Sequence, residues 1–297
     1  MTELTQQLIN GLTLGCIYAL VALGYTMIFG VLELIAFAQG GVYMVGAYVG
    51  LAIASGALAA NPVVTLAAAL VTAAGAGAII NMLIDRVGYR PIRGAKRLIP
   101  LISGIGIYMF LENGVGVAIG KEPRPYPTLL PQGSLQFAGL VVTKAQITVA
   151  VIAVICMIAL YLIVQRTRTG LAMRAVAERP ATAGLMGIES ERVIILTFAL
   201  GGALSAVAGV LVGTYVGVAT PTMGFLIGVK AFAAAVIGGI GSIPGAMVGA
   251  LSVGVVESLG AGYISSAWGD AIVFAALILV LVVRPSGFFG AAHVEKV

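Results

Sequence analysis

The sequence has few charged residues. They make up 9% of 297 residues, whereas soluble domains carry about 25%. Hydrophobic residues make up 60%, and the mean hydropathy is +1.11. The water-facing surface must therefore be small. The net charge of +5 does not indicate a nucleic-acid surface, because the basic residues sit in loops between apolar runs, where they act as an orientation signal.

Catalytic motifs and cofactor signatures are also missing. No G-x-x-x-x-G-K-[ST] motif is present, so the chain cannot hydrolyse ATP through a P-loop. In "GGIGSIPG" (238–245), Pro244 occupies the position of the third glycine of a dinucleotide-binding turn. The only histidine, His293, lies in the tail, and Cys16 and Cys156 lie inside apolar runs. We therefore expect no enzyme activity, no disulfide, no metal and no cofactor.

Apolar runs of about 20 residues dominate what remains, and each is long enough to cross a bilayer as a helix. An outer-membrane barrel would need short alternating strands, and "VTLAAALVTAAGAGAII" does not alternate. We expect spans at residues 8–30, 41–59, 62–84, 98–120, 147–164, 193–217 and 267–283, and an interrupted apolar region at 229–262. The prediction is one all-α polytopic domain over residues 1–297, with about eight or more transmembrane helices, some broken or re-entrant.

The basic residues indicate orientation. The first 85 residues contain no Lys or Arg, whereas the loops 85–98 and 165–192 carry five basic residues each. Both loops are therefore expected in the cytoplasm, with the segment 121–146 and the N-terminus outside. Four prolines and Gly133 argue against regular helix in that outer segment. Arg284 and Lys296 favour a cytoplasmic C-terminus, which requires an even number of crossings after residue 192.

Small residues and a few intramembrane polar residues point to helix packing and to a pathway. "GALSAVAG" (202–209) and "GAMVGALSVG" (245–254) predict close helix contacts. The stretch 238–245 resembles a helix break, which is tolerated at membrane depth only where it is buried or lines water. It is expected either to shape a translocation path or gate or to serve as a structural turn. We name as path candidates Gln39, Lys230, Gly239, Gly241, Pro244 and Glu257.

Two of these residues, Lys230 and Glu257, are a candidate pair across the arms of the break, and the alternative is that they do not meet. Glu112, in "MFLENGVG", is expected to be the partner of a polar group on a neighbouring helix rather than a substrate contact.

The charged stretch 168–192, "RTGLAMRAVAERPATAGLMGIESER", interrupts the apolar pattern. Pro180 predicts the start of a second short helix, Gly187 its end, and Ser190 a cap for the next span. Such a pair could lie on the membrane surface as an anchor, but it has mixed charges and no aromatic residue. Its alanine-rich surface favours docking into a cleft of a partner protein.

The chain resembles LivH-type permeases, the membrane subunits of high-affinity branched-chain amino acid ABC importers. The resemblance extends over nearly the whole chain and includes "NGLTLGCIYALVALGYTMIFGV", "RVGYRPIRGAKRLIPLISGIG" and "GVKAFAAAVIGGIGSIPGAMVGALSVGVVES". One difference is that family members often have His where this chain has Gln39. The resemblance implies that the insert 165–192 is a coupling segment seated in a groove of an ATPase, through Arg174, Ala177, Glu178 and Gly187.

The resemblance also implies partners. These are two cytoplasmic ATPases, a second homologous permease forming a heterodimer, and a periplasmic substrate-binding protein, all at the inner membrane of a bacterium. Three alternatives remain at this stage. They are an ABC importer of urea or amides, an ATP-independent secondary transporter or channel for small polar solutes, and a purely structural membrane subunit. A secondary transporter would need ion-coupling carboxylates at the midplane and no docking insert.

Overall fold

A computed structural model describes residues 2–34, 36–56, 61–96, 98–137, 140–265, 268–284 and 286–290. Arg97, His293 and Lys296 lie outside the described residues. Within the described part, six helices are long and apolar enough to span a membrane, and shorter apolar helices accompany them. The prediction of an all-α polytopic membrane protein is confirmed. The six long helices are α1 (Thr2–Leu32), α3 (Pro62–Ile84), α4 (Leu98–Ile119), α5 (Lys144–Arg166), α8 (Ser190–Val216) and α10 (Ile243–Tyr263).

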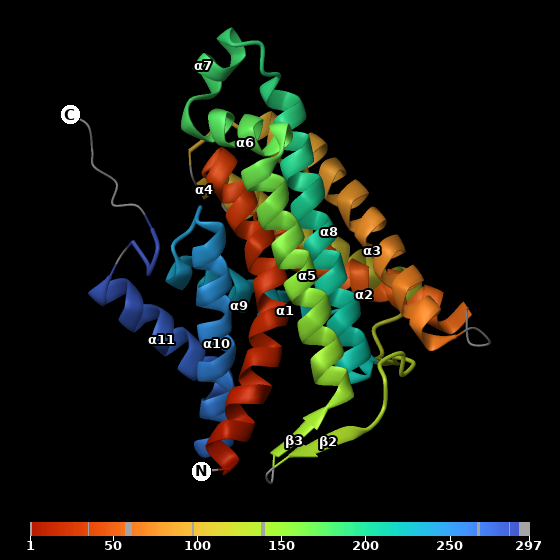
Figure 1. Cartoon of the computed structure of the whole chain (residues 1–297). Helices are drawn as coiled ribbons and strands as arrows, with labels where there is room; N and C mark the ends of the chain where they lie inside the picture. The colour runs from red at the N-terminus through yellow and green to blue at the C-terminus, as the bar shows by residue number, and fades with distance from the viewer. Residues whose placement is uncertain are drawn as a thin grey trace.

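Shorter elements complete the bundle (Figure 1). The helices are α2 (Gln39–Gly56), α6 (Arg168–Glu178), α7 (Pro180–Leu185), α9 (Met223–Gly238) and α11 (Gly269–Val283), with a π-helical turn η1 (Asp85–Tyr89) and a 3-10 turn η2 (Arg90–Ile92). The strands are β1 (Arg124–Pro125), β2 (Ser134–Phe137), β3 (Leu140–Thr143) and β4 (Val218–Ala219).

Local signals set several helix boundaries. Pro62 begins α3, and the Asn61 side chain accepts a hydrogen bond from the Val63 amide at 3.1 Å. A capping box of Thr143 and Gln146 begins α5. These residues satisfy backbone donors that the first turn of a helix leaves free. The spans predicted from hydropathy at 62–84 and 98–120 agree with α3 and α4 within one residue.

The centre of the bundle is α1, which runs between α10, α5 and α8 (Figure 1). Helices α1 and α8 are mostly enclosed, whereas α3, α4 and α5 expose most of their side chains. Those exposed side chains are largely apolar, for example Val71, Phe110 and Ile155. Such faces fit the hydrocarbon of a bilayer or another membrane chain.

Close backbone contacts hold the enclosed helices together. A Cβ atom added to Gly254 on α10 would collide with the backbone of Gly11 and Gly15 on α1. One added to Gly209 on α8 would collide with the backbone of Tyr43 on α2. The interpretation of both small-residue stretches as helix contacts is therefore confirmed.

Two small antiparallel sheets lie in the loops at the end of the bundle that holds the N-terminus. β2 pairs with β3, and β1 pairs with β4, which joins the loop after α4 to the loop after α8. The segment 121–146 contains no helix before α5 among its described residues, as predicted, but the strand pairing was not predicted.

The chain reverses direction between α9 and α10 and again between α10 and α11. Gly249 on α10 lies against Ala234 and Gly238 of α9, so these two helices form an antiparallel pair. Gly269 at the start of α11 lies beside Glu257, whereas the amide of Phe289 donates to the Gly238 carbonyl at 2.9 Å. Helices α9 and α11, with 16 and 15 residues, are shorter than the six spanning helices. The even number of crossings expected after residue 192 stays a prediction.

Candidate translocation and coupling sites

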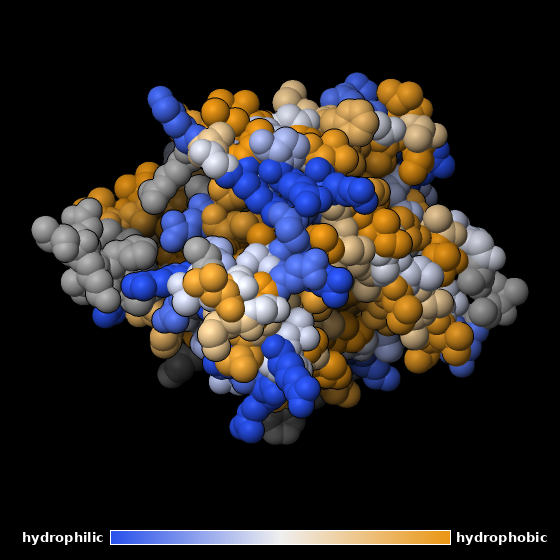
Figure 2. Space-filling model, turned by 90° about the horizontal axis from the view of Figure 1, so that it is seen from above, coloured by the Kyte–Doolittle hydropathy of each residue, from blue (hydrophilic) through white to orange (hydrophobic). Residues whose placement is uncertain are grey.

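The basic loops meet at one end of the molecule, called here the basic end. Its Arg residues come from η1, η2 and the 165–192 insert, and Figure 2 shows hydrophilic residues gathered across it. Arg93 donates to both carboxylate oxygens of Asp85, at 2.5 and 2.7 Å, and its other nitrogen lies 2.8 Å from Glu191. Arg90 also reaches Glu191, at 3.3 Å. The prediction that the two loops share one side of the protein is confirmed.

This ion network was not predicted. The Asp85 side chain is only 1% exposed, so its charge depends on Arg93. Glu191 is the second residue of α8 and lies at the end of the insert. The network therefore ties the beginning of α8 to the end of α3.

The insert forms two short helices, as predicted. Helix α6 ends at Glu178, Pro180 begins α7, and Gly187 has a positive φ of 81°. Ser190 is not the cap of the next span, because the cap position is Glu189 and Ser190 is the first residue of α8.

The insert residues named from the resemblance, Arg174, Ala177, Glu178 and Gly187, are all exposed. Arg174 donates to Gln165 at 3.2 Å. Figure 1 shows α6 and α7 at the far end of the bundle from the N-terminus. Leu171, Leu185 and Met186 also expose their side chains, by 60%, 88% and 79%. The insert thus presents an apolar and charged surface outside the spanning helices.

The candidate pair of Lys230 and Glu257 forms between α9 and α10, with 2.8 Å between Nζ and Oε1. The structure adds two partners. Asp270 on α11 lies 2.5 Å from the same nitrogen, and the Tyr18 hydroxyl on α1 donates to Glu257 at 2.9 Å. Lys230 is 8% exposed and Glu257 15%. The network joins four helices around one buried cation.

The break between α9 and α10 is a tight turn. Gly239 and Gly241 have φ values of 101° and 93°, which glycine tolerates without steric cost. The Ser242 hydroxyl accepts from the Gly245 amide at 3.2 Å, and Pro244 lies in the first turn of α10. The amide of Phe288 donates to the Ile237 carbonyl at 2.9 Å, so residues after α11 cover this turn.

Gln39 is the first residue of α2 and is fully buried. Its carbonyl oxygen accepts from the Ser205 hydroxyl at 3.1 Å. A Cβ atom on Gly24 or on Gly201 would lie 3.0–3.3 Å from the Gln39 amide nitrogen. The side chain is thus enclosed where α1 and α8 meet.

Comparison with known proteins places this arrangement in a family. The family described as "Branched-chain amino acid transport system / permease component" matches residues 7–281. The chain belongs to this family. The permease family resemblance drawn from the sequence is thereby confirmed.

Three relatives from this family match over nearly their whole lengths. The high-affinity branched-chain amino acid transport system permease protein BraD of Pseudomonas aeruginosa is 46% identical over 98% of this chain and 97% of its own length. The corresponding LivH proteins of Salmonella typhimurium and Escherichia coli are 45% and 44% identical, with the same coverage. No solved structure matches the chain.

Proposed function

We propose that this permease-family protein is the membrane-spanning subunit of an ATP-driven importer of branched-chain amino acids. The observation that carries the proposal is the match over 98% of the chain to relatives named as branched-chain amino acid permeases. The assembly is expected to contain a second, homologous permease, two ATPases and a periplasmic binding protein. The basic end faces the cytoplasm of a bacterial cell, and the N-terminus lies outside.

The exposed insert supports a docking role. An ATP-driven chain without a P-loop needs a separate ATPase, and α6 and α7 offer a partner the exposed residues Arg174, Ala177, Glu178 and Gly187. The ion network at Glu191 offers a mechanical connection, since motion of the insert reaches both α8 and α3 through it. The proposed path has three moving parts. They are the turn with Gly239, Gly241 and Pro244, the Lys230–Glu257 pair, and Gln39.

Uptake of labelled leucine, isoleucine and valine into proteoliposomes tests the proposal. The vesicles contain the permease pair, with the binding protein outside and the ATPases and ATP inside. We expect uptake that requires every component. Uptake that persists without the ATPases would instead indicate a secondary transporter or channel.

Charge reversal tests the coupling role. Arg174→Glu and Glu178→Lys place like charges against the proposed docking groove, so uptake should fall by about tenfold or more while ATP hydrolysis continues. Arg168→Glu is the matched control, because it lies on α6 but on a different face. Normal uptake in both insert variants would assign the insert to membrane anchoring.

A further inference from the structure

A cleft of about 450 Å³ lies between α4 and α9. This volume falls in the range of sites that enclose small ligands, roughly 300–1,000 Å³. Apolar side chains form most of its wall, and its polar members are Tyr108 and Glu112 from α4 and Thr222 from the start of α9. The apolar members are Ile105, Met109, Phe225 and Leu226.

The cleft combines a negatively charged side chain with the positively polarised N-terminus of a helix. Glu112 is a carboxylate on α4, one turn from Tyr108 and on the same helix face. Across from it α9 begins, and Thr222 at the cap position makes no capping bond with its side chain. The N-terminus of a helix favours anions, and a carboxylate favours cations. Between apolar walls, these groups fit a zwitterion with an aliphatic side chain.

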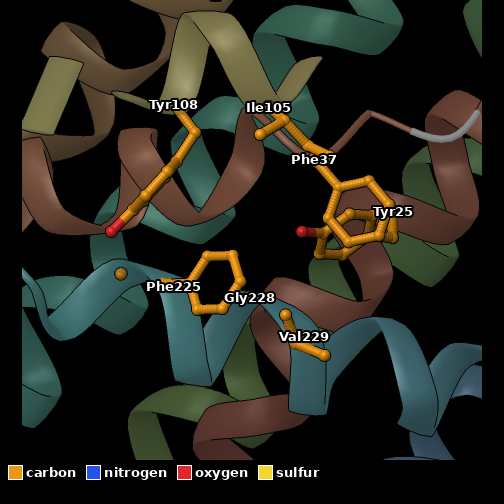
Figure 3. A pocket seen from close by; sticks show the side chains of 8 residues that line it. Tyr25, Phe37, Ile105, Tyr108, Phe225, Gly228 and Val229 are labelled. Carbon is orange, nitrogen blue, oxygen red and sulfur yellow. The ribbon is translucent and has the colours of Figure 1, made fainter. Parts of the chain in front are cut away.

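The cleft narrows into an inner pocket that shares Ile105, Tyr108 and Phe225 with it. This pocket leaves about 10 Å³, which is room for one water molecule. The Tyr25 hydroxyl points into it (Figure 3). Tyr25 is 3% exposed, and its hydroxyl has no hydrogen-bond partner among the described residues. A buried hydroxyl without a partner is costly, which favours a polar ligand or water at this point.

Three aromatic rings close the pocket toward the basic end. Their centroids are 6.4 Å apart for Tyr25 and Phe37, 5.9 Å for Tyr25 and Phe232, and 5.3 Å for Phe37 and Phe232. A second crevice lies one helical turn further along α1, between Tyr25 and Phe29. It is too narrow for a water molecule. Its lining consists of Tyr25, Phe29, Leu34, Phe232, Ala235 and Ile240. Ile240 belongs to the turn between α9 and α10, so the crevice leads from the rings to that turn.

Each ring comes from a different element: Tyr25 from α1, Phe37 from the segment before α2, and Phe232 from α9. Near the rings, α2 and α9 are in backbone contact at Gly40 and Gly224. A shift of α9 along this contact moves Phe232 away from the other two rings. The contacts among the three rings are apolar, so separating the rings breaks no hydrogen bond between them.

We propose that the α4–α9 cleft binds the transported amino acid and that Tyr25, Phe37 and Phe232 form its gate toward the basic end. Glu112 accepts hydrogen bonds from the ammonium group, and Thr222 with the first turn of α9 binds the carboxylate. Ile105 and Phe225 contact the aliphatic side chain. The binding role rests on the proposed function, whereas the gate rests on the ring geometry alone.

Thiol labelling tests the gate. The full chain, with Cys16→Ser and Cys156→Ser, carries Phe225→Cys as a reporter in the cleft, and a membrane-impermeant maleimide is applied from the basic end. Adding Phe232→Ala should raise the labelling rate by about tenfold, the factor expected when two ring contacts are lost. Phe110→Cys is the control, since it lies on the opposite, exposed face of α4 and should not respond.

The conservative Phe232→Leu variant keeps apolar volume and should give an intermediate rate, which distinguishes gate opening from unfolding. An unchanged rate at Phe225→Cys, or an equal rise at Phe110→Cys, would overturn the gate.

Ligand protection tests the binding site in the assembled importer. Leucine should slow labelling of Phe225→Cys, and Glu112→Gln should weaken this protection by about tenfold, the loss expected for one charge-assisted hydrogen bond. 4-Methylpentanoate, which lacks the ammonium group, should protect both forms equally. Leucine uptake without any protection would overturn the binding site but not the proposed function. A tenfold gate effect in an assembly that takes up no branched-chain amino acid would overturn the function but not the gate.

Discussion

At the residue scale, Lys230 on α9 is a buried cation paired with two carboxylates. It neutralises Glu257 and Asp270 while itself only 8% exposed. Lys230→Met leaves two carboxylates without a cation, so we expect a loss of about 3–5 kcal/mol of stability. Thermal unfolding of the detergent-purified chain measures this loss of stability. The neutral variant Lys230→Met/Glu257→Gln/Asp270→Asn should regain most of the loss, and a wild-type unfolding temperature in Lys230→Met alone would contradict the prediction.

Arg93 at the basic end is also the cation of a pair with a buried carboxylate, that of Asp85. Arg93→Met leaves the buried Asp85 unpaired and should cost about 3–5 kcal/mol. Arg192 provides the matched control, because its pair with Glu189 is mostly exposed, with 78% and 59% of the two side chains accessible. Arg192→Met should cost at most about 1 kcal/mol. Equal unfolding temperatures for the two variants would show that the Arg93 network does not contribute to stability.

At the scale of elements, glycine contacts between helices determine how closely α1 approaches α10. Gly254→Ala introduces a methyl group against the α1 backbone, and overpacking of this kind costs about 1–3 kcal/mol. Gly75→Ala on α3 is the control, since nothing lies within 4 Å of the added atom. It should be neutral or stabilising, because alanine favours helix by up to about 1 kcal/mol. Thermal unfolding compares the two, and a more stable Gly254→Ala would refute the close contact.

Elements with strong local signals were predictable. Asn61 and Pro62 mark the start of α3, and Pro180 and Gly187 delimit α7, because each residue acts on its own backbone. Helix α9 begins at Met223, six residues before the interrupted apolar region predicted at 229–262, and the Thr222 side chain at its cap position makes no capping bond. The β1–β4 pair escaped prediction because each strand has only two residues, too few for any periodicity.

Contacts between distant helices were the least predictable part of the site. The Lys230–Glu257 pair was a candidate because both charges flank one break in the sequence. Asp270 was missed because its approach to Lys230 depends on how α11 returns along α9 and α10. The α4–α9 cleft was missed for the same reason, since Ile105 and Phe225 meet only in the folded bundle. Hydropathy identifies the helices that cross the membrane but does not specify their neighbours.

At the scale of the whole molecule, the charge distribution predicts orientation. The basic end holds the described arginines of both loops, and cytoplasmic loops of membrane proteins are enriched in Lys and Arg. In a chain with Cys16→Ser and Cys156→Ser, a cysteine at Gly184 tests this end, and a cysteine at Gln132 tests the opposite end. Both positions are exposed. An impermeant maleimide should label Gly184→Cys only in inside-out vesicles and Gln132→Cys only in right-side-out vesicles. The reverse pattern would place the insert outside the cell, where no ATP-driven partner could reach it, and would contradict the coupling role of α6 and α7.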